Sequence, residues 1–180
     1  MALPPGTYAL GPEQAALTVR TGTAGAAART GHNLVIEVQS WSAELRIGTE
    51  PFAMAIQLTA DPASLRVREG RGGLQPLREE DRRAIERRIG REVLGSGTIA
   101  FRSARAEPAD GALHADGELE LHGRHGPVSV VLRVDGSGRL SASATIMQTA
   151  FGIKPYSAMF GRLKVRDEVQ VALEGRLPAG

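Results

Sequence analysis

Two of the four histidines are the residues of this sequence best placed to hold a metal, because imidazole nitrogens ligate zinc. His122 and His125 are three residues apart around Gly123, shortly after Glu118 and Glu120. On a turn their rings need not converge, and no spacing fixes a third ligand. We therefore predict no metal site. We expect His122 to hold the turn through backbone hydrogen bonds and His125 to be exposed.

Other catalytic groups are scarce. His32 stands just before a long apolar run, where a turn or rim position is a better interpretation than a general base. No serine lies in a Gly-x-Ser-x-Gly elbow, and the absence of cysteine excludes disulfides and thiolate nucleophiles. The Gly70–Gly73 segment is not followed by the Lys-Ser or Lys-Thr of a phosphate loop. We predict a protein without catalytic residues or cofactor, and an enzyme using His32, His122 or His125 stays as an alternative.

The composition narrows the classes of partner. The 180 residues include 22 Lys and Arg against 20 Asp and Glu, and only seven aromatic residues. This balance has neither the excess positive charge nor the stacking surface of a nucleic-acid-binding protein. No apolar run approaches the roughly 20 residues of a membrane span, so we expect no stable membrane insertion. The N-terminus does not resemble a signal peptide, which predicts a cytoplasmic protein.

Short segments of alternating apolar and polar residues run through the chain and predict strands. The clearest pair is 128–134 and 140–146, separated by Asp-Gly-Ser-Gly. The full set of expected strands covers 7–10, 16–21, a long run over 34–47, 52–60, 64–69, 98–105, 112–121, 128–134, 140–147 and 168–176. Turn residues between them are typical of an all-β, antiparallel barrel or sandwich, which we expect to form one domain over 1–180.

Two segments depart from this alternation. Residues 78–94 predict a helix, because Ile85, Ile89 and Val93 form an apolar stripe and acidic residues precede basic ones. We expect it to pack on the barrel wall or over its mouth. The segment 151–161 gathers three aromatic residues and a methionine among glycines and a proline. It predicts an apolar loop that either forms the lip of a cavity or plugs the core.

Five fragments, in order, resemble the YceI-like family of lipocalin-like barrels associated with polyisoprenoid lipids. They are Tyr8-Ala9-Leu10-Gly11-Pro12-Glu13, Thr98-Ile99-Ala100-Phe101-Arg102-Ser103, the strand–turn–strand from Gly117 through His122-Gly123 to Pro127-Val128-Ser129-Val130, Phe151-Gly152-Ile153, and Asp167-Glu168-Val169-Gln170-Val171. The resemblance implies a single antiparallel lipocalin-like β-barrel with the helix at about 78–94 inserted. It also implies binding, sequestration or transport of an apolar chain, such as an isoprenoid quinone or polyprenyl lipid.

A barrel of about eight strands either encloses a small ligand or fills its interior with side chains. Small aliphatic residues such as Ala142 and Ala144 on an inward face favour an open tunnel. Our candidates for lining or closing the cavity are Leu34, Ile36, Val38, Trp41, Phe52, Phe101, Phe151, Tyr156, Met159 and Phe160, with Tyr156 or Arg162 meeting a polar head group. The alternative is an interaction or stress-response module with a filled barrel. The sequence also leaves a homodimer open.

Overall fold

The computed structural model describes residues 4–49, 53–103 and 105–177, and it is built almost entirely of antiparallel strands. Most strands coincide with a stretch of alternating or apolar residues that is bounded by Gly, Pro, Asp or Ser. The strands are β1 (Gly6–Leu10), β2 (Ala15–Arg20), β3 (Thr23–Ala24), β4 (His32–Val38), β5 (Trp41–Ile47), β6 (Met54–Ala60), β7 (Leu65–Gly72), β8 (Ile99–Ser103), β9 (Glu107–Ala109), β10 (Ala112–Leu121), β11 (Arg124–Val134), β12 (Arg139–Met147), β13 (Ser157–Ala158), β14 (Leu163–Val165) and β15 (Glu168–Arg176).

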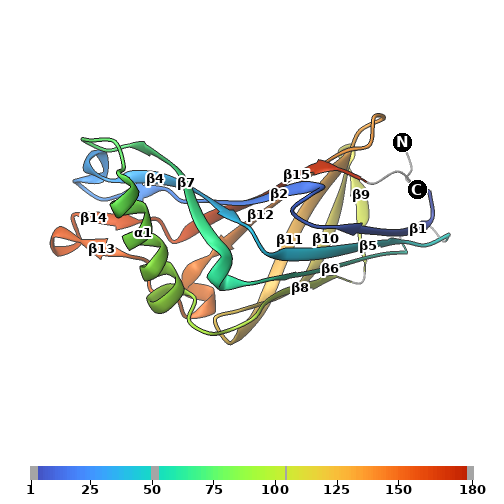
Figure 1. Ribbon diagram of the computed structural model, residues 1–180. Helices are drawn as coiled ribbons and strands as arrows, with labels where there is room; N and C mark the ends of the chain where they lie inside the picture. The colour runs from blue at the N-terminus through green and yellow to red at the C-terminus, as the bar shows by residue number, and fades with distance from the viewer. Residues whose placement is uncertain (1–3, 50–52, 104, 178–180) are drawn as a thin grey trace.

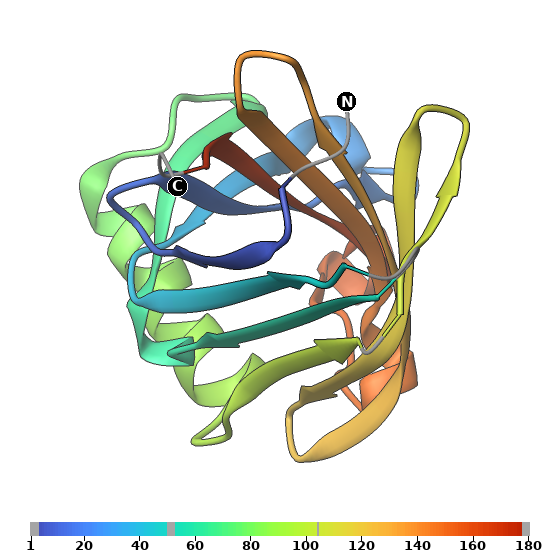
Figure 2. The ribbon, with the colours of Figure 1, turned by 90° about the vertical axis from the view of Figure 1, so that its right-hand side faces the viewer.

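Most of these strands form one large sheet that curls around a central space (Figure 2). Its order is β1-β5-β6-β8-β10-β11-β12-β15-β2-β4-β7, with β9 added beside β10. Among the described residues, β1 pairs only with β5, and β7 pairs only with β4. The predicted antiparallel, lipocalin-like barrel with one helix is confirmed, as a curled sheet in which β1 and β7 are the two edges.

The β11–β12 hairpin shows how local chemistry sets the register. Asp135 Oδ1 accepts hydrogen bonds from the backbone N–H groups of Ser137, at 2.8 Å, and Arg139, at 3.1 Å. The hydrogen bond from the Ser137 hydroxyl and these two amides hold the pKa of Asp135 below its usual 3.8. Gly138 has a φ of 78°, a conformation that glycine adopts without strain. The predicted Asp-Gly-Ser-Gly turn therefore joins these strands.

The long run expected over 34–47 is wrong as a single strand. It folds as β4 and β5, which are separated at Gln39 and Ser40. The Ser40 amide donates to Ser64 Oγ at 3.0 Å, and the Ser64 hydroxyl donates to the Asp61 carbonyl at 2.7 Å. Because these partners lie 20 or more residues away along the chain, the continuous apolar pattern gave no sign of the break.

The predicted helix is confirmed nearly to its ends. α1 (Glu79–Arg88) continues as the π-helical segment η3 (Ile89–Val93), in which the Leu94 amide donates to the Ile89 carbonyl at 2.9 Å. α1 lies beside β7 at the end of the molecule that also holds β3, β13 and β14 (Figure 1). Glu86 Oε1 accepts a hydrogen bond of 2.8 Å from the Val67 amide. The helix thereby satisfies a backbone donor on an edge strand of the sheet.

The apolar segment 151–161 contains three short elements. They are the 3₁₀ turn η4 (Gln148–Phe151), the strand β13, and the 3₁₀ turn η5 (Met159–Gly161). β13 pairs with β14, and β14 pairs with β3, so that these three strands form a small second sheet. A further 3₁₀ turn, η1 (Ala28–Thr30), contacts β14.

Candidate functional site: an apolar cavity in one half of the barrel

The inward face of β12 passes from a packed core to a hollow. Leu140 is 1% exposed, whereas Ala142, Ala144 and Ile146, which follow it on the same face, are only partly buried. Neighbouring β15 repeats the change, since Leu173 is buried and Val171 and Val169 are partly exposed. Inward-facing aliphatic side chains that keep exposed surface border an empty space. One half of the barrel is therefore filled and the other is open.

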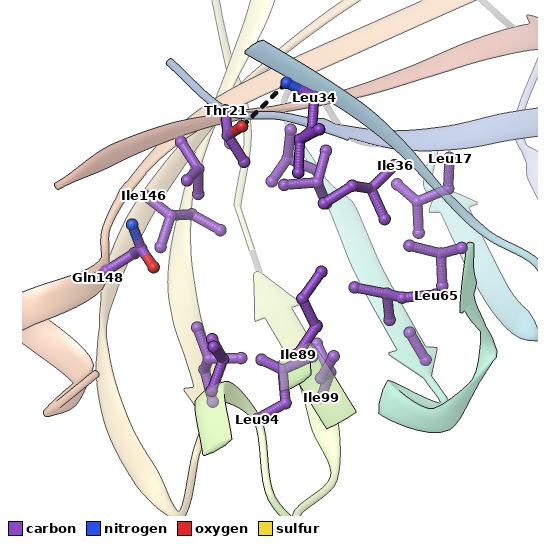
Figure 3. A pocket seen from close by; sticks show the side chains of 18 of the residues that line it. Leu17, Thr21, Leu34, Ile36, Leu65, Ile89, Leu94, Ile99, Ile146 and Gln148 are labelled. Atoms are coloured by element: carbon purple, nitrogen blue, oxygen red, sulfur yellow. Dashed lines mark hydrogen bonds between the residues drawn. The ribbon is translucent and has the colours of Figure 1, made fainter. Parts of the chain in front are cut away.

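The open half contains a cavity of about 630 Å³. This size is within the range of roughly 300–1,000 Å³ found for small-molecule sites. Strands from both sides of the barrel and the helix supply its walls, and Figure 3 shows their side chains converging on the same space. The aliphatic residues labelled there are Leu17, Leu34, Ile36, Leu65, Ile89, Leu94, Ile99 and Ile146.

The helix closes one side of the cavity. Ile85, Ile89 and Val93, the stripe identified in the sequence, all line it. The predicted position of this helix against the barrel is thus confirmed. Arg88 from the helix and Tyr156 from the loop before β13 also belong to the lining, and the Arg88 guanidinium lies 4.9 Å from the centre of the Tyr156 ring.

Polar side chains collect at the end of the cavity near the small sheet. Thr21 and Thr23 come from the β2–β3 region, His32 begins β4, and Gln148 lies in η4. Lys164 of β14 and Tyr156 of the loop before β13 also belong to the lining. Away from these polar groups, the lining includes Leu10, Leu45, Leu132 and Leu173, with Glu44 beside Leu45 on β5. The cavity therefore has an apolar depth and a polar end.

Hydrogen bonds fix the orientation of these polar groups. Gln148 Nε2 donates to the Arg166 carbonyl at 2.9 Å, so its amide oxygen lies on the cavity side (Figure 3). Thr21 Oγ1 accepts from the Leu34 amide at 3.1 Å, which ties β2 to β4 beside the cavity. His32 Nε2 lies 2.7 Å from the Gln75 carbonyl and must donate to it.

Asp167 holds the segment that carries Gln148. Its Oδ1 accepts from the Thr149 amide at 2.8 Å, its Oδ2 accepts from the Thr149 hydroxyl at 2.5 Å, and its backbone carbonyl accepts from the Gln148 amide at 3.0 Å. The hydroxyl and amide of Thr149 lower the pKa of Asp167 below its usual 3.8. The carboxylate thus caps η4 at the edge of the cavity.

The sequence-predicted site residues fall into three groups. Leu34, Ile36, Val38, Phe101 and Tyr156 line the cavity. Trp41 and Phe151 are buried outside the lining, and Phe151 packs its ring beside Gly126 of β11 because η4 turns it toward that strand. Met159 and Phe160 are exposed, and the Arg162 side chain is outside the lining. Phe52 lies outside the described residues.

The apolar loop, expected to be either a lip or a plug, is buried in its first half and exposed in its second half. Ile153, like Phe151, is buried, and Ile153 also lines the cavity. Beyond Pro155, Met159 and Phe160 face solvent. The first half completes the wall and the second half is exposed at the polar end.

Several lining residues were missed. Val169 and Val171 had a usable signal, since they alternate with polar residues in a strand that the sequence analysis recognised. Gln148 and Lys164 had none, because their polar side chains in an irregular stretch resemble those of an ordinary surface loop. Only the pairing of β14 with β3 and the capping by Asp167 bring them to the cavity.

His122 and His125 lie at the turn between β10 and β11. His122 lies in the turn with a φ of 53°, and its Nδ1 lies 3.3 Å from the Leu94 carbonyl, a backbone group 28 residues away along the chain. His125 is exposed, as expected, and its Nδ1 lies 3.1 Å from Glu118 Oε1. Over residues 4–49, 53–103 and 105–177, no three His, Asp or Glu side chains gather as metal ligands would. Within the same ranges, each helix is too short or too polar to cross a bilayer.

Comparisons with known proteins agree with this architecture. BcnA of Burkholderia cenocepacia is 16% identical with a TM-score of 0.64, over 92% of this chain and 96% of that one. A mutant CJ YCEI protein with a monobromobimane guest is 11% identical with a TM-score of 0.54, over 81% of this chain and 85% of that one. At these identities the structures show the fold alone, and no curated protein matches the chain. The family model of the YceI-like domain matches residues 8–177, and the chain belongs to the YceI-like family.

Proposed function

We propose that this protein binds a single apolar chain, of the isoprenoid quinone or polyprenyl lipid class, and sequesters or carries it without chemical change. The observation that supports this proposal is the hollow, aliphatic half of the barrel next to a packed half. A protein that used its barrel only as a scaffold for partners would have no need of inward Ala142 and Ala144 beside unfilled space. The cavity therefore favours the carrier over the filled-barrel alternative.

The energetics fit a flexible hydrocarbon. Burial of about 300 Å² of chain surface yields about 7.5 kcal/mol at roughly 25 cal/mol/Å². Part of this is offset by the lost freedom of the chain and of the ligand as a whole. Micromolar affinity requires about 8 kcal/mol net, so a longer chain or a polar contact at the head group must add to the binding.

The polar end would supply that contact. Gln148 Oε1 is an acceptor on the cavity side, and His32 and Lys164 also belong to the lining. A ligand with its chain toward Leu132 and Leu173 and a hydroxyl or carbonyl head group toward Gln148 would match both ends. This orientation also leaves the head group nearest to the exposed half of the loop.

The test is organic extraction of the purified protein followed by mass spectrometry, together with titration of the delipidated protein with a fluorescent isoprenoid. Ala144→Trp places a large ring in the hollow and should abolish binding. Ala172→Trp is the matched control, because Ala172 on β15 alternates with the lining residues Val171 and Leu173 and is not itself in the lining.

The proposal requires a co-purifying apolar chain or saturable binding by the delipidated protein, together with a loss of binding in the Ala144 variant alone. Failure of the delipidated wild-type protein to bind any isoprenoid would overturn it. Equal binding by the Ala144→Trp variant and the wild type would also overturn it.

A further inference from the structure

Two chain segments at the polar end of the cavity carry unbalanced positive charge. Residues 22–34 and 152–166 contain Arg29, Lys154, Arg162, Lys164 and Arg166, and they contain no Asp or Glu. The whole chain is nearly neutral, with 22 basic and 20 acidic residues. All five basic residues are exposed. Their positive charge is therefore a local feature of this end.

The two segments lie side by side. The Ala27 amide donates to the Arg162 carbonyl at 2.8 Å, and the Arg166 amide donates to the Gly22 carbonyl at 2.8 Å. Arg166 Nε also donates to the Thr23 carbonyl at 3.2 Å. In Figure 1 the β13–β14 hairpin and the loop between β3 and β4 project together at the end beside α1. The five cations thus belong to one surface.

Large apolar side chains project from the same end. Phe160, at the tip of the β13–β14 hairpin, is fully exposed, and Met159 beside it is 52% exposed. Leu74, in the loop between β7 and α1, is 78% exposed, and the Gln75 carbonyl that follows it accepts from His32 at the cavity. Two separate loops therefore present apolar side chains to solvent within a basic surround.

The backbone at the hairpin tip is held in a costly conformation. Met159 and Phe160 have φ values of 52° and 55°, in the left-handed region that bulky residues seldom occupy. An asparagine or glycine would fit that turn with less strain. A phenylalanine that is strained and also fully exposed contributes little to the folded monomer, which indicates that its side chain has a partner elsewhere.

Two acids, Asp167 and Glu168, directly follow Arg166 along the chain. The Asp167 carboxylate is bonded to Thr149. At the start of α1, Glu79 pairs with Arg83 and Glu80 pairs with Arg78, while Asp81 accepts from the Arg78 amide. Asp167 and Glu168 offset part of the positive charge, and five cations against these two carboxylates leave the surface net positive.

We propose that this surface, named here the basic–aromatic face and consisting of Arg29, Leu74, Lys154, Met159, Phe160, Arg162, Lys164 and Arg166, docks reversibly on an anionic lipid bilayer. Phe160 and Leu74 enter the interfacial region, and the basic residues meet anionic lipid head groups. Tyr156 and Lys164 both line the cavity and belong to the same loop and hairpin, so docking brings the polar end of the cavity to the membrane surface. This inference goes beyond ligand binding, since vesicle docking can be measured on protein without ligand.

The test is co-sedimentation of the purified full chain with vesicles of phosphatidylcholine containing 30% phosphatidylglycerol, compared with phosphatidylcholine alone. We expect binding to the anionic vesicles, with weak binding to the neutral ones and a steep loss as salt is raised. Phe160→Asn suits the left-handed backbone and removes the ring, and it should lower vesicle affinity roughly tenfold or more. Its urea midpoint should equal or exceed that of the wild type.

Charge reversal supplies the matched pair. Lys154→Glu combined with Arg162→Glu should abolish docking, because the double variant reverses two of the five positive charges. The fold should be kept, because neither side chain is needed for a described hydrogen bond or ion pair. Arg133→Glu makes the same kind of change near the β11–β12 turn, at the opposite end of the molecule (Figure 1), and should leave docking unchanged.

Three results would overturn the proposal. The first is equal binding to neutral and anionic vesicles, and the second is unchanged binding by Phe160→Asn. The third is a wild-type chain that ignores vesicles but self-associates in sedimentation velocity through Phe160, which would assign the face to a second copy. Loss of isoprenoid binding by Ala144→Trp with vesicle docking intact would separate this proposal from the proposed function.

Discussion

The Arg88 guanidinium lies over the Tyr156 ring, 4.9 Å from its centre, and so connects the helix to the loop across one side of the cavity. Arg88 also forms an ion pair of 3.2 Å with Glu92, one turn further along. Because both Arg88 and Tyr156 are exposed, the cation–π contact is worth about 0.5–1 kcal/mol. At this energy it makes a small contribution to the attachment of the loop to the helix.

A double-mutant cycle on this pair should give a coupling energy of about 0.5–1 kcal/mol. The variants are Arg88→Met, Tyr156→Leu and their combination, with stability measured by urea unfolding. Tyr156→Phe is the control and should keep the coupling, because the ring is retained. The cycle cancels the separate loss of the Arg88–Glu92 pair. A coupling of zero would show that the two side chains act independently.

Glu86→Ala should destabilise the protein by about 1.5–3 kcal/mol, because the Val67 amide on edge strand β7 loses a charged acceptor. Glu86→Gln keeps an acceptor oxygen and should cost less. Hydrogen exchange at the Val67 amide reports the contact directly and should speed up most in the alanine variant. If the two variants exchange and unfold alike, the hydrogen bond does not stabilise the edge.

The same substitution at two alanines should separate the hollow half of the barrel from the packed half. Ala115 is fully buried, so Ala115→Leu should overpack the core and cost about 1–3 kcal/mol. Ala144→Leu extends into the cavity and should change stability by less than about 0.5 kcal/mol or raise it. Thermal and urea unfolding measure both. Equal destabilisation at the two sites would mean that the Ala144 end is also closely packed.

Gln148→Leu should weaken binding of an isoprenoid alcohol roughly threefold to tenfold, the effect of one hydrogen bond of about 0.5–1.5 kcal/mol. The acceptor that it removes is the amide oxygen on the cavity side. The methyl ether of the same alcohol lacks the donor and should bind the wild type and the variant alike. Titration of delipidated protein with both ligands tests this, and an equal loss for the ether would assign the effect to packing.

Asp167→Asn should reveal a pH-dependent contribution to stability. The folded-state pKa of Asp167 lies below its usual 3.8, so the charged form is favoured by folding. The contribution is fully present above the unfolded pKa and is lost as the pH falls through the lower, folded value. The difference in urea midpoint between the wild type and the variant should therefore be constant above about pH 5 and shrink below 3.8.

Asp135→Asn provides the comparison for this experiment. Its pKa is lowered by Ser137 and Arg139 at the β11–β12 turn, away from the cavity. The difference in urea midpoint between the wild type and Asp135→Asn should also shrink as the pH falls, and the ligand affinity should not change. Asp167→Asn, in contrast, loosens η4 beside Gln148 and should weaken ligand binding at neutral pH. If the difference in urea midpoint between the wild type and Asp167→Asn widened as the pH fell, the lowered pKa of Asp167 would be contradicted.

The antiparallel fold and its helix could be predicted from local pattern alone. Alternation in β12 and β15, the Asp135–Gly138 turn and the stripe of Ile85, Ile89 and Val93 are short-range signals, and each specifies its element without help from distant residues. The break at Gln39 and Ser40 could not be predicted, because the hydrogen bonds that hold it come from Ser64 and its neighbours.

The residues of the cavity likewise divide into those that local pattern predicts and those that it does not. Inward faces of recognised strands supplied Leu34, Ile36, Val38 and Phe101, since a side chain's face follows from its parity along the strand. Fewer cavity residues could be predicted in the apolar loop 151–161, because composition does not determine which of its side chains turn inward. Tyr156 borders the cavity, whereas Phe160 faces solvent.

The sequence by itself determined which residues face inward and that the inward set is aliphatic, because both depend on periodicity and residue type. Only the tertiary structure decided that the set fills the barrel at Leu140 and leaves it hollow at Ile146. The physical reason is that packing is a property of three-dimensional volume. Whether side chains meet across a barrel depends on its width and on the helix and hairpin that border it, and neither is encoded in one strand's pattern.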